Sequence, residues 1–267
     1  MFIGLDASRA NRPQKSGVEW YAYHLLHNLF KIDSKNQYFL YTEKKLTAEL
    51  RPDNENFKER IVRWPLGKLW TLGGLSLEIL FNKPDILFIP SHTFPLVKAK
   101  KNVISWHDVG YKYYPETYTR WELASLECGS KRAAKIADAI ITISNSSKED
   151  IMKHYRVEES RIKVIYLGCN HERWFPREES AVKQGLLANQ IDSPYFICIG
   201  RLALRKNIIG MIKIYNSFRK KIKRSYNLIL VGKPSALNEE IEAEINHSPY
   251  KSEIRRLGWL PTDQLPL

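Results

Sequence analysis

The sequence has few cysteines and no long apolar run. Its three cysteines, Cys128, Cys169 and Cys198, are odd in number and widely spaced among 267 residues, which argues against a disulfide framework and for a reducing compartment. No apolar run approaches the ~20 residues that cross a bilayer. The first residues, MFIGLDASRA, lack the charged and apolar regions of a signal peptide. We therefore expect a cytoplasmic protein.

Several familiar cofactor and catalytic motifs are also missing. No GxGxxG follows a strand-like run and no GxxxxGK[ST] occurs, which excludes the dinucleotide fingerprint and the P-loop. His171-Glu172 has no second histidine at helical spacing, and the sequence contains no GxSxG elbow. We therefore expect neither a metal ion nor a bound cofactor.

Acidic residues are in deficit, with 29 Asp and Glu against 42 Lys and Arg and a net charge of +13. A basic surface favours nucleic acid, anionic lipid or phosphate-bearing ligands. The chain has no RNP, KH or zinc-finger pattern, so we expect no nucleic acid partner. The one dense basic run, at 219–224, is most simply interpreted as the solvated C-terminal end of a helix.

Short apolar runs of strand length alternate with longer helical patterns. Strands are predicted at 2–7, 37–42, 86–90, 103–106, 139–144 and 161–168, and helices at 18–30 and 121–137. Ser146 and Glu149 predict a capping box at the start of a further helix. Apolar strands interleaved with helices indicate a parallel sheet covered on both faces.

The polar stretch 171–180, which contains Pro176, interrupts this pattern. It predicts two domains, residues 1–176 and residues 177–267. Strands are then expected at 195–200, 227–232 and 253–260, and helices at 207–224 and 237–245. Doubly wound sheets usually hold about five or more strands, so the second domain is expected to be incomplete. The predicted class is α/β, with two Rossmann-like, doubly wound domains.

Candidate binding residues follow the predicted strands. Ser16-Gly17 precedes the first helix, where glycine permits close backbone approach and free N–H groups suit an anion; a plain strand–helix turn is the alternative. His107-Asp108 follows a strand at the edge where open α/β sheets bind ligands. The histidine could donate to a ligand hydroxyl while the carboxylate fixes the ring. Taken by itself, however, the His-Asp pair favours a purely structural histidine.

The most specific local signal lies after the strand that ends in Gly200. Arg201, Arg205 and Lys206 come before a helix that begins near Asn207. Cations at a strand end beside a helix N-terminus suit a pyrophosphate, and ordinary surface charge is the alternative.

Taken in order, six segments resemble the retaining, GT-B fold glycosyltransferases of family 4. GLDASRANRPQKSGVEWYAYHLL is similar to that family's first strand, glycine loop and helix, and VISWHDVGYKYYPE to its His-Asp segment. The other similar segments are PDILFIPSHTFPL, ADAIITISNSSKEDIMKHYRVEESRIKVIYLGCN, YFICIGRLALRKNIIGMIKIYNSF, and LILVGK with IRRLGWLPTDQLP.

The resemblance implies two facing domains that transfer a sugar, such as mannose, from a nucleoside diphosphate sugar to a glycan or lipid-linked acceptor. Retention of the anomeric configuration and a role in cell-surface polysaccharide or glycolipid synthesis are implied as well. Arg201 and Lys206 would neutralise the diphosphate without a metal ion, His107 would contact the donor sugar, and Ser16-Gly17 would lie near the donor phosphates. Glu19 departs from the family pattern beside that glycine.

The family's acidic E-x7-E motif would fall after Leu267, where this sequence stops. The resemblance thus implies a truncated nucleotide domain and little or no transfer by the chain as it stands. The alternative hypothesis is a non-catalytic remnant that binds an acceptor or a partner chain.

Apolar and aromatic residues crowd around Lys68 in the first domain. They are Trp64, Leu66, Leu69, Trp70 and Leu72. Such a mixture suits the interfacial zone of a membrane, and packing onto the domain core is the alternative. We therefore expect an anionic membrane surface as a partner, on the inner face of the cytoplasmic membrane.

Overall fold

A computed structural model describes residues 1–65, 69–234, 239–261 and 264–265. The chain divides into two compact units. The first comprises Met1–Tyr113 and Arg120–Leu167, and the second comprises Tyr114–Thr119 and Gly168–Leu267. The predicted boundary at 176/177 lies in the connection between the last strand of the first unit, β7 (Ile162–Val164), and helix α5 (Glu179–Ala188).

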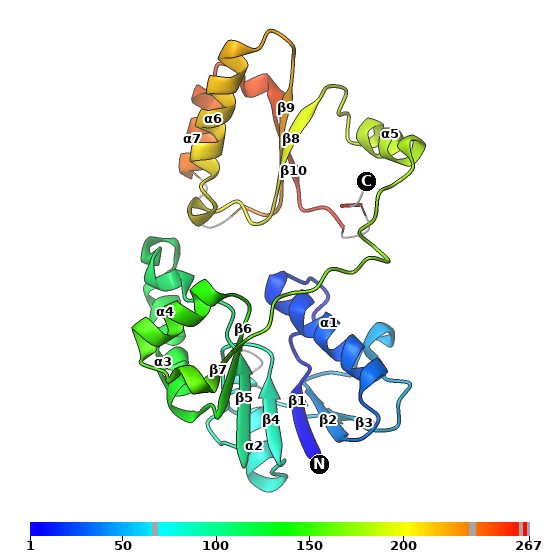
Figure 1. Ribbon diagram of the computed structural model, residues 1–267, viewed down its shortest axis with the longest axis vertical. Helices are drawn as coiled ribbons and strands as arrows, with labels where there is room; N and C mark the ends of the chain where they lie inside the picture. The colour runs from blue at the N-terminus through cyan, green and yellow to red at the C-terminus, as the bar shows by residue number, and fades with distance from the viewer. Residues whose placement is uncertain (66–68, 235–238, 262–263, 266–267) are drawn as a thin grey trace. The chain divides into compact units, whose positions relative to one another are not determined.

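The first unit is built on a seven-stranded parallel sheet with the order β3-β2-β1-β4-β5-β6-β7 (Figure 1). Besides β7, its strands are β1 (Phe2–Asp6), β2 (Gln37–Thr42), β3 (Phe57–Ile61), β4 (Ile86–Ile89), β5 (Lys101–Ser105) and β6 (Ala139–Thr142). The direction of winding reverses between β1 and β4, which makes this the topological switch point where open α/β sheets bind ligands. The predicted doubly wound parallel sheet is confirmed.

In the described residues, four α-helices cover this sheet: α1 (Gly17–Ile32), α2 (Gly74–Phe81), α3 (Arg120–Ile136) and α4 (Asn145–Tyr155). Leu26 of α1 is fully buried in one cluster with Leu5 of β1 and Leu40 of β2. Each such side chain contributes about 1.5–3 kcal/mol by leaving water. This packing fixes the start of α1 above the carboxyl end of β1, where the candidate site lies.

One strand and two α-helices of the described chain were not predicted from the sequence, and one helix cap was predicted at the wrong residue. Strand β3 lies at a sheet edge and has three consecutive charged residues, Lys58 to Arg60, so its apolar alternation is weak. Helix α2 is apolar on nearly every side, and helix α5 contains Gly185. The cap of α4 is Ser144 and not Ser146, because the Ser144 hydroxyl accepts from the backbone N–H of Ser147 at 3.1 Å.

The second unit contains a three-stranded parallel sheet in its described residues, with the order β10-β9-β8. The strands are β8 (Tyr195–Ile199), β9 (Asn227–Val231) and β10 (Ile254–Gly258), and the helices besides α5 are α6 (Ile208–Lys221) and α7 (Glu239–His247). Leu228 and Leu230 of β9 pack with α6 and α7, whereas Ile229 packs with Leu186 of α5. The helices therefore cover both faces of the sheet, as Figure 1 shows.

The two edges of this second sheet differ in chemistry. Strand β10 has Arg255 and Arg256 at its edge, and charged side chains discourage further strand pairing. Strand β8 instead exposes Phe196, Ile197 and Ile199. An apolar edge of this kind is open to another strand.

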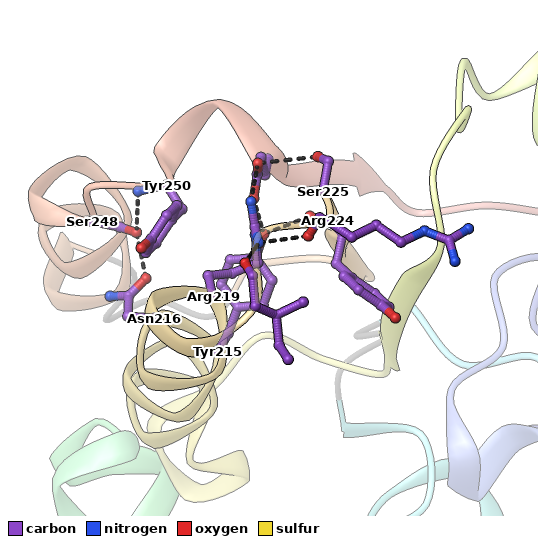
Figure 2. Close-up of polar contacts among 10 residues, drawn as sticks. Tyr215, Asn216, Arg219, Arg224, Ser225, Ser248 and Tyr250 are labelled. Carbon is purple, nitrogen blue, oxygen red and sulfur yellow. Dashed lines mark hydrogen bonds and ion pairs between the residues drawn. The ribbon is translucent and has the colours of Figure 1, made fainter.

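One end of α6 is tied down by a polar network around Arg219 (Figure 2). The buried Arg219 guanidinium donates to both carboxylate oxygens of Glu253, at 2.6 and 2.9 Å, and to the carbonyl oxygens of Ile222 and Arg224. Tyr215 also donates to Glu253, at 2.7 Å. Arg219 is therefore a buried residue, and the interpretation of it as part of a solvated helix end is wrong. The sequence did not reveal this pairing because Glu253 lies 34 residues further along the chain.

We expect Glu253→Gln to lower the stability of the second unit, because buried Arg219 would lose its counter-charge. The Arg219 hydrogen bonds lower the pKa of Glu253 from 4.5 to about 2. A lowered pKa adds stability above the unfolded-state value, and this stability is lost as the pH falls toward 2. Urea unfolding of the wild type and of Glu253→Gln should therefore show a difference in the free energy of unfolding. This difference should be constant above about pH 5 and should shrink as the pH falls below 4.5. Glu244→Gln, at an ion pair of 4.0 Å with exposed Lys213, serves as the control and should change little; a difference independent of pH would contradict the prediction.

Candidate functional site

Several sequence-predicted residues of the first unit meet at the carboxyl ends of its strands. His107 follows β5 by two residues, and Ser16 ends the loop that connects β1 to α1. Both connections leave the sheet at the same edge, beside the switch point. The structure therefore brings the two predicted segments of the first unit together at one end of the sheet.

His107 is partly buried against the first turns of α1. The ring of Tyr21 meets the imidazole edge to face at a centroid distance of 4.5 Å, and the Tyr21 hydroxyl is hydrogen-bonded to Ser105 at 2.8 Å. Burial lowers the pKa of His107, and the charge of Asp108 offsets this only in part. In the described part of the chain, His107 Nε2 is buried without a hydrogen-bond partner. A neutral imidazole with a vacant nitrogen can bind a ligand hydroxyl.

Tyr21→Ala is expected to raise the pKa of His107 toward its ordinary value, because removing the ring admits water to the imidazole. Tyr21→Phe should leave that pKa nearly unchanged, since the ring stays and only the hydrogen bond to Ser105 is lost. The measurement is an NMR titration of the histidine ring protons, with the His107 signal assigned by its absence from His107→Gln. Equal pKa values in all three Tyr21 forms would show that this ring does not shield His107.

Asp108 holds the turn after β5. Its Oδ1 accepts from the backbone N–H of Gly110 at 2.9 Å, and its carbonyl oxygen accepts from Trp106 Nε1 at 3.2 Å. The hydrogen bonds of the described residues do not join this carboxylate to His107. Asp108 therefore acts on His107 through charge and backbone position, and the predicted fixing of the ring falls instead to Tyr21.

The start of α1 is already occupied in part by a carboxylate of the chain itself. Glu19 accepts from both the backbone N–H of Ser16, at 3.1 Å, and the Ser16 hydroxyl. Arg9 and Arg12 lie 3.4 and 3.5 Å from the same carboxylate. These partners lower the pKa of Glu19 despite its burial. A Cβ at Gly17 would meet no protein atom within 4 Å, so space for a ligand remains beside this cap.

Arg9 and His92 also follow strands at this edge of the first sheet, and neither was predicted from the sequence. His92 follows β4, the strand that pairs with β5. Burial of its ring, together with the nearby charges of Arg9 and His107, lowers the pKa of His92 to about 4. A histidine directly after an apolar strand was the available signal for His92. Nothing local marks Tyr21, because its partner Ser105 lies 84 residues away.

Of the predicted diphosphate-binding residues, Ser16 and Gly17 lie in the first unit, and the two cations Arg201 and Lys206 lie in the second unit, after β8. Arg201 follows Gly200 directly and is exposed, and exposed Lys206 ends the short helix Leu204–Lys206 before α6. Asn207 has a left-handed backbone, with φ of 52°, and its side chain accepts from the N–H of Gly210. Two cations thus stand at a strand end beside a helix N-terminus, which is suitable chemistry for an anion.

Each strand of the second sheet reaches its carboxyl end at a glycine with positive φ. The values are 149° at Gly200, 142° at Gly232 and 69° at Gly258. A Cβ at Gly232 would lie 1.8 Å from the carbonyl oxygen of Gly200. Glycine allows this close packing of neighbouring turns, and it leaves the strand ends beside Arg201 without side chains.

The segment expected at a membrane is only partly exposed. Trp70 is buried and its Nε1 donates to the carbonyl oxygen of Val62 at 2.8 Å, and the ring of Trp64 packs against Gly73. Leu69 is exposed, whereas Leu66 and Lys68 lie outside the described residues. In the described chain, no helix is long and apolar enough to cross a bilayer, and no three His, Cys, Asp or Glu side chains gather as a metal site.

The sequence profile of Glycosyltransferase Family 4 matches residues 15–173, which include Ser16, Gly17, His107 and Asp108. The chain is also 24% identical over 170 residues to O-antigen chain mannosyltransferase B of Escherichia coli, a match that covers 63% of this chain and 44% of that protein. It is 27% identical over 186 residues to O-antigen chain mannosyltransferase RfbU of Salmonella typhimurium, covering 69% and 44%. The chain thus spans less than half the length of either relative.

Among solved structures, the fold is similar to that of HepE from Anabaena in complex with UDP and glucose. The TM-score is 0.64 at 16% sequence identity, over 99% of this chain and 71% of that one. This likeness concerns the fold, which is GT-B-like with Rossmann-type α/β units.

Proposed function

The chain belongs to Glycosyltransferase Family 4, and we propose that it serves the transfer of a sugar from a nucleoside diphosphate sugar to a glycan or lipid-linked acceptor. The observation on which this proposal rests is the vacant, buried Nε2 of His107 at the switch point of the first sheet. The fold leaves this nitrogen unsatisfied, and a buried unsatisfied nitrogen is unfavourable until a ligand binds it.

Within this proposal each candidate residue contacts a particular part of the donor. His107 donates to or accepts from a hydroxyl of the donor sugar, and Tyr21 holds its ring in place. Arg201 and Lys206 bind the diphosphate and stabilise the negative charge that grows as the sugar leaves. Ser16 and Gly17 lie near the donor phosphates. Since the two cations neutralise the leaving group, we propose transfer without a metal ion.

Mannose is the sugar that we propose, because both curated relatives are named as O-antigen chain mannosyltransferases. The proposed acceptor is a growing surface polysaccharide on a lipid carrier at the inner face of the cytoplasmic membrane. Retention of the anomeric configuration is proposed together with the family's chemistry.

The test is to incubate the chain with GDP-mannose, UDP-glucose and UDP-galactose, each with and without a polyprenyl-phosphate-linked glycan, and to follow the product by NMR. A new glycosidic bond with the anomeric configuration of the donor supports the proposal, and an inverted product contradicts retention. Hydrolysis or transfer that persists in His107→Ala at the wild-type rate would exclude the proposed role of His107. Because the resemblance implies little or no transfer by this chain, donor binding without transfer does not by itself separate an enzyme from a binding protein. The same assay with an acidic E-x7-E segment appended separates them, and a continued absence of transfer would favour the binding protein.

A further inference from the structure

Helix α2 exposes an apolar face of the first unit. Leu77, Leu80 and Phe81 are 48%, 58% and 78% exposed. Their spacing of i, i+3 and i+4 places the three side chains on one side of the helix. Gly74, Leu75, Ser76 and Ile79 are buried, so the opposite side packs on the unit. Single exposed apolar residues are common, but three together on a short helix form a patch.

The patch extends beyond α2 to Leu96, which is also well exposed. The backbone N–H of Leu96 donates to the hydroxyl of Ser76 at 2.7 Å, which places the Leu96 loop beside the helix. The same serine hydroxyl donates to the carbonyl oxygen of Leu72. These bonds hold the loop in position, so the apolar surface belongs to a fixed part of the first unit.

Two lysines flank this patch along the chain. Lys83 and Lys98 are exposed and follow Phe81 and Leu96 by two residues each. Lys98 also lines a surface hollow whose other charged residues are Lys100, Lys135, Arg161 and Asp138. The only acidic residue of α2, Glu78, is neutralised by Arg60 at 2.9 Å. The patch therefore combines an apolar centre with a basic border.

We propose that this surface docks the first unit onto an anionic phospholipid bilayer. The surface consists of Leu77, Leu80, Phe81 and Leu96 with Lys83 and Lys98, and we call it the α2 face. Its apolar side chains would enter the headgroup boundary, and its lysines would contact lipid phosphates. This proposal rests on the proposed function in one respect only, namely that the bilayer would carry the lipid-linked acceptor. The test of the α2 face requires no sugar transfer.

The border charges favour a bilayer over a second copy of the chain. In a symmetric dimer the same patch faces itself, so Lys83 and Lys98 of both copies would be brought together. Like charges at such an interface oppose association. Anionic headgroups instead offer a continuous negative surface to the same lysines.

The experiment measures flotation of the chain with vesicles of phosphatidylglycerol and phosphatidylcholine, and with vesicles of phosphatidylcholine alone. We expect binding to the anionic vesicles that weakens at high salt. Leu80→Ser/Phe81→Ser should lower the partition coefficient at least about tenfold, and Lys83→Glu/Lys98→Glu should lower it by a similar factor. The matched control is Leu187→Ser/Ile214→Ser, which removes two exposed apolar side chains from the second unit and should leave binding unchanged.

Circular dichroism and the unfolding midpoint establish that each variant folds, as expected for exposed positions. The proposal is overturned if the folded Leu80→Ser/Phe81→Ser variant binds as the wild type does, if both vesicle types bind equally, or if neither binds. It is also overturned if light scattering shows a wild-type dimer that this variant converts to a monomer, because the α2 face would then be a protein interface. Loss of sugar transfer with intact vesicle binding would count against the proposed function and leave the α2 face standing.

Discussion

Arg201→Ala is expected to weaken the binding of a nucleoside diphosphate to the chain by about ten- to a hundredfold. A hydrogen bond to a charged group contributes about 1.5–3 kcal/mol, and each 1.4 kcal/mol is about a factor of ten in affinity. Arg201 is exposed at the carboxyl end of β8, so its removal leaves no buried group unsatisfied. Calorimetric titration with GDP and with UDP measures the effect directly and without an acceptor.

Arg205→Ala is the matched control for this prediction. Arg205 is an exposed cation a few residues further along, in the short helix Leu204–Lys206, and the proposed function assigns it no contact with the donor. A loss in Arg205→Ala equal to that in Arg201→Ala would mean that only general positive charge matters. Unchanged affinity in Arg201→Ala would remove this residue from the diphosphate site.

Gly232→Ala is expected to destabilise the second unit by about 3–5 kcal/mol. Two causes combine at this position. The backbone φ of 142° is one that residues with a side chain rarely adopt, and the new Cβ would lie 1.8 Å from the carbonyl oxygen of Gly200. Hydrogen exchange of the β9 amides should accelerate accordingly, because β9 is the central strand of this sheet.

Gly200→Ala separates the two causes. Its φ of 149° is similar, but a Cβ there would meet nothing within 4 Å. We therefore expect Gly200→Ala to destabilise by backbone strain alone, on the order of 1–3 kcal/mol. Equal effects at the two glycines would show that steric overlap at Gly232 contributes nothing.

The strands that the sequence predicted best are the buried ones. QYFLYT at 37–42 forms β2 with the predicted bounds, because a strand covered on both faces is apolar along its whole length. Strand β3 was missed for the converse reason, since its edge position tolerates Lys58 and Glu59. Helix α2 was missed because its sequence, GLSLEILF, shows no clear polar face.

A residue of the candidate site could be predicted only where the strand just before it in the sequence determines its position. His107 follows a strand of the first sheet and Arg201 a strand of the second, and within each sheet the carboxyl ends of parallel strands share one edge. The contact of Tyr21 with His107 depends on how α1 packs across the sheet, which no local pattern contains. The pairing of Arg219 with Glu253 is equally nonlocal, so a run of basic residues concealed a buried ion pair.

The unequal edges of the second sheet also determine where an additional strand could pair with it. With Arg255 and Arg256 on β10, additions at that edge are disfavoured, whereas Ile197 and Ile199 leave β8 ready to accept a parallel neighbour. A strand supplied as a separate peptide would therefore pair with this sheet along β8. The sheet of the first unit is separate from this one, so a strand added along β8 would leave the first sheet unchanged.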